Sequence, residues 1–395
     1  MYRGTRNSIL QYCEPPKRGT FSMVTVLGFA IATIFLAYLS FGSSPKAEPT
    51  LRFVSIVHRH GERVPTFTYP LDPFQNESFW SEGKGQLMNI GKLNIYELGK
   101  FLRSRYDGFI PAKYKSSHIH VRSTYADRCI MSAQVLLAGL YPPVDSQIWN
   151  KDLLWQPIPV HSVPRTMDNV LLCGTTPCPL FVKEKAAVMN SSIQKMMDEN
   201  RQLIDHLSKM TGVEMKSVLD IEFLYDNLLI AEEQGYKLPE WTHGIYPDKL
   251  KPFAMASLSV FSETPTLKKL CSGLLIHEII TNMKNKTSSA DFDRLLTLYS
   301  AHDLTVISLW RSLGVVQEVP KPNYGATFII ELHQTSNKYF VKLLYKNHAL
   351  DKELTVLNIK GCDSVHDEMN DLSVILSCSV QVKSMNMSGY KAPPT

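Results

Sequence analysis

An apolar run that ends abruptly in charged residues constrains the fold of this chain more than any other feature. Phe53 to Val57 predicts a buried strand, and the sequence Arg-His-Gly-Glu-Arg-Val-Pro follows at residues 59–65. A strand with this ending places one imidazole and two guanidinium groups on a single turn at the edge of a sheet. Open α/β sheets bind their ligands at that edge. The segment therefore predicts a sheet with a charged site beside it.

Two later strands are followed by polar residues in the same manner. Ile119 to Arg122 is predicted as a second strand, and Leu295 to Ser300 as a third, shortly before His302 and Asp303. A helical pattern follows each of them. Because alternating strands and helices build a parallel sheet with helices on its faces, the polar residues after the three strands should meet at one edge.

The middle of the chain has helical patterns and no strand pattern, which predicts an inserted helical segment. Two apolar-rich runs, Phe328–Leu332 and Tyr339–Leu344, then predict a hairpin. We predict the α/β class, with a central, mostly parallel sheet flanked by helices and a smaller helical cap domain. The predicted divisions are 1–22 (cytosolic or n-region segment), 23–42 (signal peptide or signal anchor), 48–160 with 290–380 (α/β domain), 161–289 (cap) and 381–395 (polar tail).

The N-terminal region carries a targeting signal. Met23 to Phe41 is an uncharged apolar run preceded by Lys17 and Arg18. It is either a cleaved signal peptide or an uncleaved anchor, and its length suits one membrane span. Both interpretations send the remaining chain into the secretory pathway, as a secreted, lysosomal or membrane-anchored protein whose main domain is lumenal or extracellular. With 42 Lys and Arg against 37 Asp and Glu, the chain has no strongly basic character that would predict a nucleic-acid partner.

Glycosylation sequons and cysteines agree with a lumenal location. The sequons lie at Asn76, Asn190, Asn285 and Asn386. Of the 7 cysteines, Cys13 precedes the apolar run, and the other six permit disulfides without determining their pairing.

The three strand endings together suit a phosphate monoester. Guanidinium groups of Arg59, Arg63 and Arg122 would bind the phosphate oxygens through planar pairs of donors. His60 would attack phosphorus, and the resulting phosphohistidine would be hydrolysed by water. His302 would donate to an equatorial oxygen, and Asp303 would protonate the leaving alcohol, which favours acidic pH.

A metal site is the rival interpretation for the histidines, because His58 and His60 could share one face of a strand. Arg59 and Arg63 beside them would repel a cation, and no third ligand stands nearby in the sequence. We therefore predict neither a metal nor another cofactor.

Several motifs resemble the histidine acid phosphatases, the branch of the histidine phosphatase superfamily that includes prostatic and lysosomal acid phosphatases. Within it the chain looks most like the insect venom-type enzymes. The resemblance covers about residues 50–380. Its anchors are VHRHGERVP at 57–65, VRSTYADRCIMSAQ at 121–134, LYPP at 140–143 and YSAHDLTV at 299–306.

The resemblance implies an α/β domain with a helical companion and assigns roles to six residues. His60 is the phosphorylated nucleophile and Asp303 the proton donor, while the phosphate is bound by Arg59, Arg63, Arg122 and His302. It also implies a Cys178–Cys378 disulfide, and it leaves Cys362 free or paired with Cys173 or Cys271. Relatives commonly have Asp after Arg-Ser-Thr, where this chain has Tyr125.

The leading functional hypothesis is therefore an acid phosphatase that hydrolyses small phosphate monoesters through a phosphohistidine. A phytase, a sugar-phosphate phosphatase or a lysophosphatidate phosphatase would share the same site residues. A catalytically silent secreted binding protein is the alternative outside the enzymes. Homodimerisation and membrane anchoring through residues 23–42 are further expectations.

Overall fold

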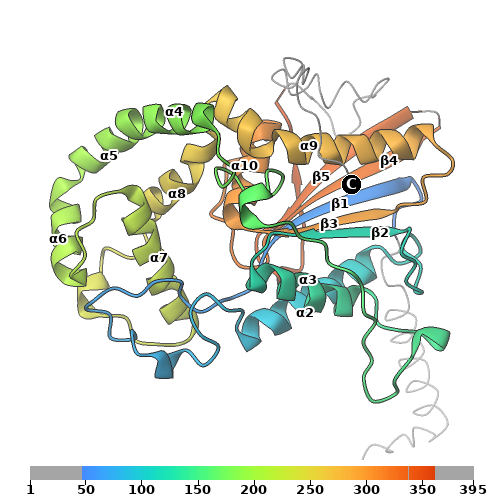
Figure 1. Ribbon diagram of the computed structural model, residues 1–395, viewed down its shortest axis with the longest axis horizontal. Helices are drawn as coiled ribbons and strands as arrows, with labels where there is room; N and C mark the ends of the chain where they lie inside the picture. Colours follow the sequence, from blue (N-terminus) through green and yellow to red (C-terminus); the bar gives the residue numbers. More distant parts are fainter. Residues whose placement is uncertain (1–46, 337, 361–395) are drawn as a thin grey trace, which may run out of the picture. The chain divides into compact units, whose positions relative to one another are not determined.

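A six-stranded sheet runs through the part of the chain that the structure describes (Figure 1). The structure is a computed structural model, and it describes residues 47–336 and 338–360. Across the sheet the strands follow the order β2-β3-β1-β4-β5-β6. Their bounds are β1 Leu51–Arg59, β2 Ile119–Ser123, β3 Leu296–Ala301, β4 Thr327–Thr335, β5 Lys338–Lys346 and β6 Thr355–Leu357.

The sheet is mixed, which confirms the α/β class and corrects the expectation of a mostly parallel sheet. β2, β3 and β1 are parallel to one another, whereas β4, β5 and β6 are antiparallel to their neighbours. Parallel strands need a long crossover, while a tight turn such as that between β4 and β5 can join only antiparallel strands. Parallel pairing is accordingly confined to the three strands that helices connect.

Helices cover both faces of the sheet, α2 and α3 on one and α9 and α10 on the other (Figure 1). β1 contributes to both layers: Phe53 and Val57 pack with α9 and α10, and Val54 and Ile56 pack with α2 and α3. Successive side chains of a strand point to opposite faces, so the middle of a strand that is buried on both faces is mostly apolar. The helix bounds are α2 Asn89–Arg105, α3 Asp127–Leu140, α9 Pro265–Ser288 and α10 Asp303–Leu313.

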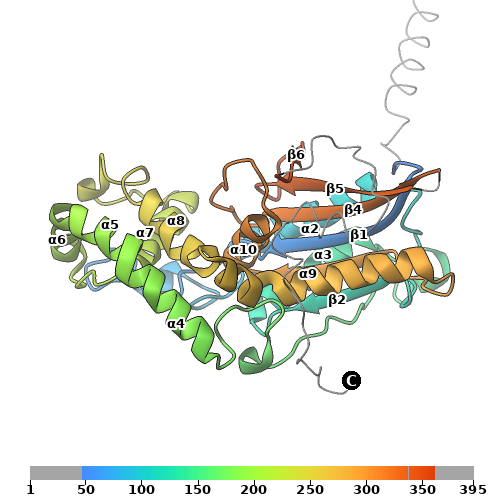
Figure 2. The ribbon, with the colours of Figure 1, turned by 90° about the horizontal axis from the view of Figure 1, so that it is seen from above.

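Five shorter helices lie beyond the end of the sheet at which α10 begins (Figures 1 and 2). The helical middle is interrupted around Asn200, where α5 ends and α6 begins. The Asn200 side chain donates to the Met196 carbonyl oxygen at 2.8 Å, a local bond that competes with helix continuation. Their bounds are α4 Pro179–Val188, α5 Gln194–Glu199, α6 Arg201–Thr211, α7 Val218–Glu233 and α8 Lys251–Ser259.

Helix α9 belongs to both parts of the fold. Leu267 and Cys271 in its first half pack with the shorter helices, while Leu275 and Met283 in its second half pack on the sheet. One continuous helix thus crosses from one hydrophobic cluster to the other. The division into a separate cap domain at residues 161–289 stays a prediction.

A disulfide joins Cys173 to Cys271, which are 98 residues apart in the sequence. The alternative that Cys362 pairs with either of them is therefore wrong. The predicted Cys178–Cys378 pair stays a prediction, because Cys378 lies outside the described residues. The Cys178 sulfur accepts a hydrogen bond from the Phe181 amide at the start of α4, at 3.4 Å.

Both chain ends lie outside the described residues, and with them the apolar run 23–41, Cys362 and the tail 381–395. Within residues 47–336 and 338–360, no helix has the length and apolar character required to cross a bilayer. Three of the predicted glycosylation sites, Asn76, Asn190 and Asn285, are exposed. Asn386 lies outside the described part.

Candidate active site

Three parallel strands end level with one another, which brings their terminal residues to one edge. Arg59 of β1 pairs in register with Ala301 of β3, and Ser123 of β2 with Ser300. The backbone amide of His60 donates to the Ala301 carbonyl oxygen at 3.0 Å. The turn after β1 is thereby tied to the end of β3, directly before His302.

Hydrogen bonds to the His60 ring determine which of its two nitrogens carries the proton. Its Nδ1 lies 2.8 Å from the Gly61 carbonyl oxygen, and a carbonyl can only accept, so Nδ1 carries the proton. Nε2 then has the lone pair, and it accepts a hydrogen bond from Nε of Arg128 at 3.0 Å. The His60 ring centroid lies 5.5 Å from that of His302 and 5.8 Å from that of Tyr324.

The turn that carries His60 is clamped by the two helices below the sheet. The Gly61 amide donates to Ser132 Oγ of α3 at 3.1 Å. A Cβ at position 61 would lie 2.7 Å from the Gly91 carbonyl oxygen of α2. Glycine is needed here because helix backbone occupies the space of a side chain.

Arg59 and Arg63 share a carboxylate from α7. Asp226 forms an ion pair with Arg63 and lies 3.8 Å from Nη2 of Arg59. The same Arg59 nitrogen is 3.0 Å from Oδ2 of Asp303, and the Arg59 guanidinium stacks 4.0 Å above the Tyr324 ring. The acid expected to act as proton donor is thus directly paired with one of the expected phosphate ligands.

Arg122 has a different set of partners. Its Nη2 lies 3.1 Å from Asp168, and its Nη1 lies 3.6 Å from Glu278 of α9. Asp168 is fully buried, whereas Tyr125 is 62% exposed and points its bulk to solvent. Asp168 and Glu278 therefore support Arg122 from outside the motif. The link from β2 to His302 runs through the Thr124 hydroxyl, 3.1 Å from Nε2 of His302.

Comparison with known proteins decides the family. The model of the histidine phosphatase superfamily (branch 2) matches residues 50–346. The chain belongs to this superfamily. It is 38% identical over 317 residues to bovine prostatic acid phosphatase, covering 79% of this chain and 81% of the relative. It is 36% identical over 317 residues to rat lysosomal acid phosphatase, covering 79% and 74%. Because these similar relatives are acid phosphatases, the chain is a histidine acid phosphatase and therefore a phosphoric monoester hydrolase.

Solved structures of bacterial phytases share the fold of this histidine phosphatase. The Klebsiella sp. ASR1 enzyme superposes with a TM-score of 0.64 at 13% identity, over 89% of this chain and 98% of its own. The Citrobacter braakii enzyme gives 0.61 at 18% identity, over 85% and 97%. A structural likeness at this level of sequence identity shows that the fold is shared, and it does not indicate the substrate.

Burial and clustered cations control the titration of the histidine phosphatase site. Burial lowers the pKa of His60 well below its usual range, and the charges of Arg128 and Arg59 lower it further. Burial, followed by Arg128, lowers the pKa of His302 to about 3. For Asp303, burial by itself raises the pKa, but Arg59 and Lys321 outweigh it and hold the pKa below its usual range.

Three charged residues of the cluster escaped the sequence reasoning. Arg128 stands in the quoted VRSTYADRCIMSAQ motif, in the first turn of the helix after β2, so the strand-end argument could have included it. Asp226 is a buried acid four residues after the buried Glu222 in a helix whose other buried residues are mostly apolar, and this spacing is visible in the sequence. Lys321 lies in the loop before β4 and is 6% exposed; nothing in the local sequence distinguishes it.

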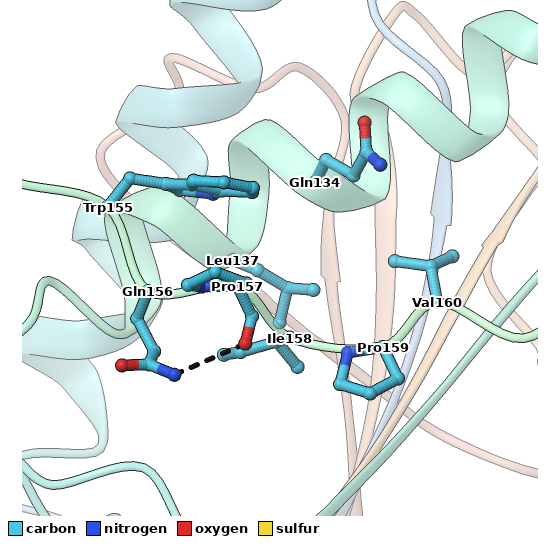
Figure 3. A pocket seen from close by; sticks show the side chains of 8 residues that line it. All are labelled: Gln134, Leu137, Trp155, Gln156, Pro157, Ile158, Pro159 and Val160. Carbon is cyan, nitrogen blue, oxygen red and sulfur yellow. Dashed lines mark hydrogen bonds between the residues drawn. The ribbon is translucent and has the colours of Figure 1, made fainter. Parts of the chain in front are cut away.

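The cluster does not resemble a metal site. Among the described residues, no three His, Cys, Asp or Glu side chains gather as ligands would, and the guanidinium groups around His60 would repel a cation. A separate surface hollow of about 370 Å³ lies between α3 and the segment 155–160 (Figure 3). Its walls are Gln134, Leu137, Trp155, Gln156, Pro157, Ile158, Pro159 and Val160, none of which belongs to the cluster.

Proposed function

We propose that this acid phosphatase uses His60 as its nucleophile, Asp303 as its proton donor, and Arg59, Arg63, Arg122 and His302 as its phosphate ligands. The observation that carries the assignment is the state of His60. Its Nδ1 proton is committed to the Gly61 carbonyl, which leaves the Nε2 lone pair directed into a cluster of guanidinium groups.

The reaction consists of two in-line displacements. Nε2 of His60 forms a bond to phosphorus as the bond to the ester oxygen breaks, and the leaving oxygen takes the proton of Asp303. Water then attacks the phosphohistidine, its proton goes to the Asp303 carboxylate, and Nε2 leaves with its lone pair restored. The guanidinium groups balance the charge of the transferred group throughout.

The pairing of Asp303 with Arg59 supplies a way to protonate the acid only when substrate is bound. Without a ligand, the 3.0 Å contact to Arg59 keeps Asp303 ionised. A bound phosphate dianion neutralises the Arg59 charge, after which burial raises the pKa of Asp303. The acid thus takes up its proton together with the substrate, which favours turnover at acidic pH.

Replacement of the nucleophile tests the assignment. His60→Ala should reduce p-nitrophenyl phosphate turnover at pH 5 by roughly 10⁴-fold or more, because no other group accepts the phosphoryl group. His206→Ala is the matched control, since this exposed histidine lies on α6. Substantial activity in folded His60→Ala protein, or absence of a phosphohistidine in rapid-quench mass spectra of the wild type, would overturn the proposal.

Leaving groups of different basicity test the proton donor. Asp303→Asn should slow hydrolysis of alkyl phosphates by about 10²- to 10⁴-fold. It should slow p-nitrophenyl phosphate less, because p-nitrophenolate leaves without a proton. Equal slowing of both substrates would assign Asp303 a role in phosphate binding alone.

The location and assembly of the enzyme belong to the same proposal. The Cys173–Cys271 disulfide, the exposed sequons and the likeness to a lysosomal acid phosphatase support the secretory pathway. We keep membrane anchoring through residues 23–42 as a prediction that N-terminal sequencing of the mature protein tests.

Homodimerisation is supported by a run of exposed apolar side chains next to the α3 hollow, at Ile148, Trp149, Leu153, Leu154 and Trp155. Light scattering tests it.

A further inference from the structure

Lys321 places a buried ammonium group beside the proposed catalytic residues. It lies in the loop before β4 and is 6% exposed. Its Nζ has no hydrogen-bond partner among residues 47–336 and 338–360, and it lies 5.0 Å from the centre of the Tyr225 ring of α7. An ammonium group carries three donors, and a buried donor without an acceptor costs free energy that a ligand can recover. Lys321 is therefore a candidate for contact with a bound molecule.

The carboxyl groups whose charges act on Lys321 already have other partners or a proton. They belong to Asp226, Asp303 and Glu222. Asp226 and Asp303 form ion pairs with arginines of the cluster. Burial, followed by the charge of Asp226, raises the pKa of Glu222 to about 8, so this third carboxyl is protonated at acidic pH. The charge of Lys321 is therefore not balanced by an anion of its own when the enzyme works in acid.

Lys321 stands on the side of the site where the alcohol part of a substrate would lie. An in-line displacement places the leaving oxygen opposite the attacking Nε2 of His60, beside the proton donor Asp303. The charge of Lys321 acts on Asp303, whereas the charges that act most strongly on His60 come from arginines and from another histidine. The next residue along the chain, Pro322, accepts a hydrogen bond from Nη1 of Arg59 at 2.8 Å through its carbonyl oxygen. A group attached to the leaving oxygen would therefore come within reach of Lys321.

We propose that Lys321 binds a second anionic group on the alcohol part of the substrate, so that the enzyme prefers phosphate monoesters that also carry a carboxylate or another phosphate. The proposal rests on the proposed function, because His60 as nucleophile and Asp303 as proton donor define the alcohol side. The second anion supplies the acceptor that Nζ lacks. Glu222, which holds its proton in acid, does not repel that anion. Lys321 thereby becomes a residue that selects the substrate.

Pairs of substrates that differ in a second anionic group test the proposal in the full enzyme at pH 5. Phosphoglycolate is compared with ethyl phosphate, and ethane-1,2-diol bisphosphate, counted per phosphate group, with 2-hydroxyethyl phosphate. In the wild type, kcat/KM of the anionic member should exceed that of its neutral partner by roughly 10- to 100-fold. Homologues one carbon longer extend the reach of the second anion.

Variants of Lys321 assign the preference to its ammonium group. Lys321→Met should remove the preference, while Lys321→Arg keeps the charge and should retain part of it. Lys195→Met is the matched control, because this lysine of α5 is 76% exposed, and it should keep the wild-type ratio. Loss of Lys321 also alters the pKa of Asp303, but this change affects both members of a pair. The ratio therefore isolates the contact with the second anion.

The outcomes separate this proposal from the one on which it rests. Equal kcat/KM within both wild-type pairs and their longer homologues would overturn it, as would a preference that survives in folded Lys321→Met protein. A preference in one pair alone supports it and assigns the subsite to carboxylates or to phosphates. Should Lys321→Met fail to fold, Lys321→Gln decides by the same ratio, and if neither folds, the wild-type ratio decides. Substantial activity in His60→Ala would defeat the proposed function, whereas an inactive His60→Ala variant beside a wild type without preference defeats this inference alone.

Discussion

Two buried charged clusters lie at opposite ends of β1, and they are built differently. The distal cluster comprises Glu331 with its neighbours Arg105, Tyr106 and His333. Glu331 Oε1 accepts from Arg105 at 2.8 and 3.1 Å and from Tyr106 at 2.8 Å, and Oε2 lies 3.2 Å from His333. The other ring nitrogen of His333 lies 2.9 Å from the Thr50 hydroxyl. Each of these charges has its partners inside the protein.

The catalytic cluster comprises Arg59, Arg63, Asp226, Asp303 and Lys321. Buried atoms here, including Nε of both arginines and Nζ of Lys321, have no hydrogen-bond partner among the described residues. A buried polar atom without a partner costs about 1–3 kcal/mol. Such a cost is common at functional sites, where a ligand supplies the missing acceptors. We therefore expect the distal cluster to serve stability, and the proposed function predicts that the catalytic cluster gives up stability for binding an anion.

The largest effect on stability should come from the distal cluster. Glu331→Gln removes the charge that Arg105, Tyr106 and His333 share, and it should lower the free energy of unfolding by about 3 kcal/mol. Turnover per folded molecule should remain unchanged, because no phosphate ligand is touched. Urea denaturation measures the free energy of unfolding, and turnover normalised by active-site titration with vanadate measures the activity per folded molecule. A change in KM would break the distinction between the clusters.

A smaller effect of opposite sign is expected in the catalytic cluster. Burial lowers the pKa of Lys321, so the fold disfavours its charge. Lys321→Met should leave the free energy of unfolding unchanged or raise it by about 1 kcal/mol. Since Lys321 helps to lower the pKa of Asp303, its loss should raise that pKa and move the basic limb of kcat to higher pH. A loss of several kcal/mol would instead make Lys321 a structural counterion.

The smallest effect on stability is expected at the border of the catalytic cluster, where His348 contacts Glu62. His348 Nε2 lies 3.4 Å from Glu62, in the nucleophile turn, and this contact raises the pKa of His348 above 6.5. The stabilisation is complete below pH 6.5 and is lost as the pH rises through the raised pKa. His348→Ala should therefore cost about 0.5 kcal/mol at pH 5 and less at pH 9. A cost that grew with pH would contradict the ion pair.

The strand endings were foreseeable because they depend on local pattern. β1 and β3 are apolar-rich runs that end in polar residues, and a helix follows β2 and β3 directly, so Arg59, His60, His302 and Asp303 fell at the expected edge. The helical middle was also recognised, but its interruption at Asn200 was not, because a side chain that caps its own backbone leaves no periodic signature. The orientation of β4 was missed for a related reason: no local pattern states which neighbour a strand will join.

The sequence by itself determined which groups meet at one edge of the sheet: an imidazole, several guanidinium groups and a carboxyl, placed near the ends of strands by apolar patterns that act over a few residues. Only the tertiary structure decided how those groups are charged and held. The pairing of Asp303 with Arg59, the Asp226 carboxylate shared by two arginines, and the Arg128 donor on Nε2 join residues distant in the chain. Electrostatic interactions and burial depend on distance in space, and that distance is set by packing.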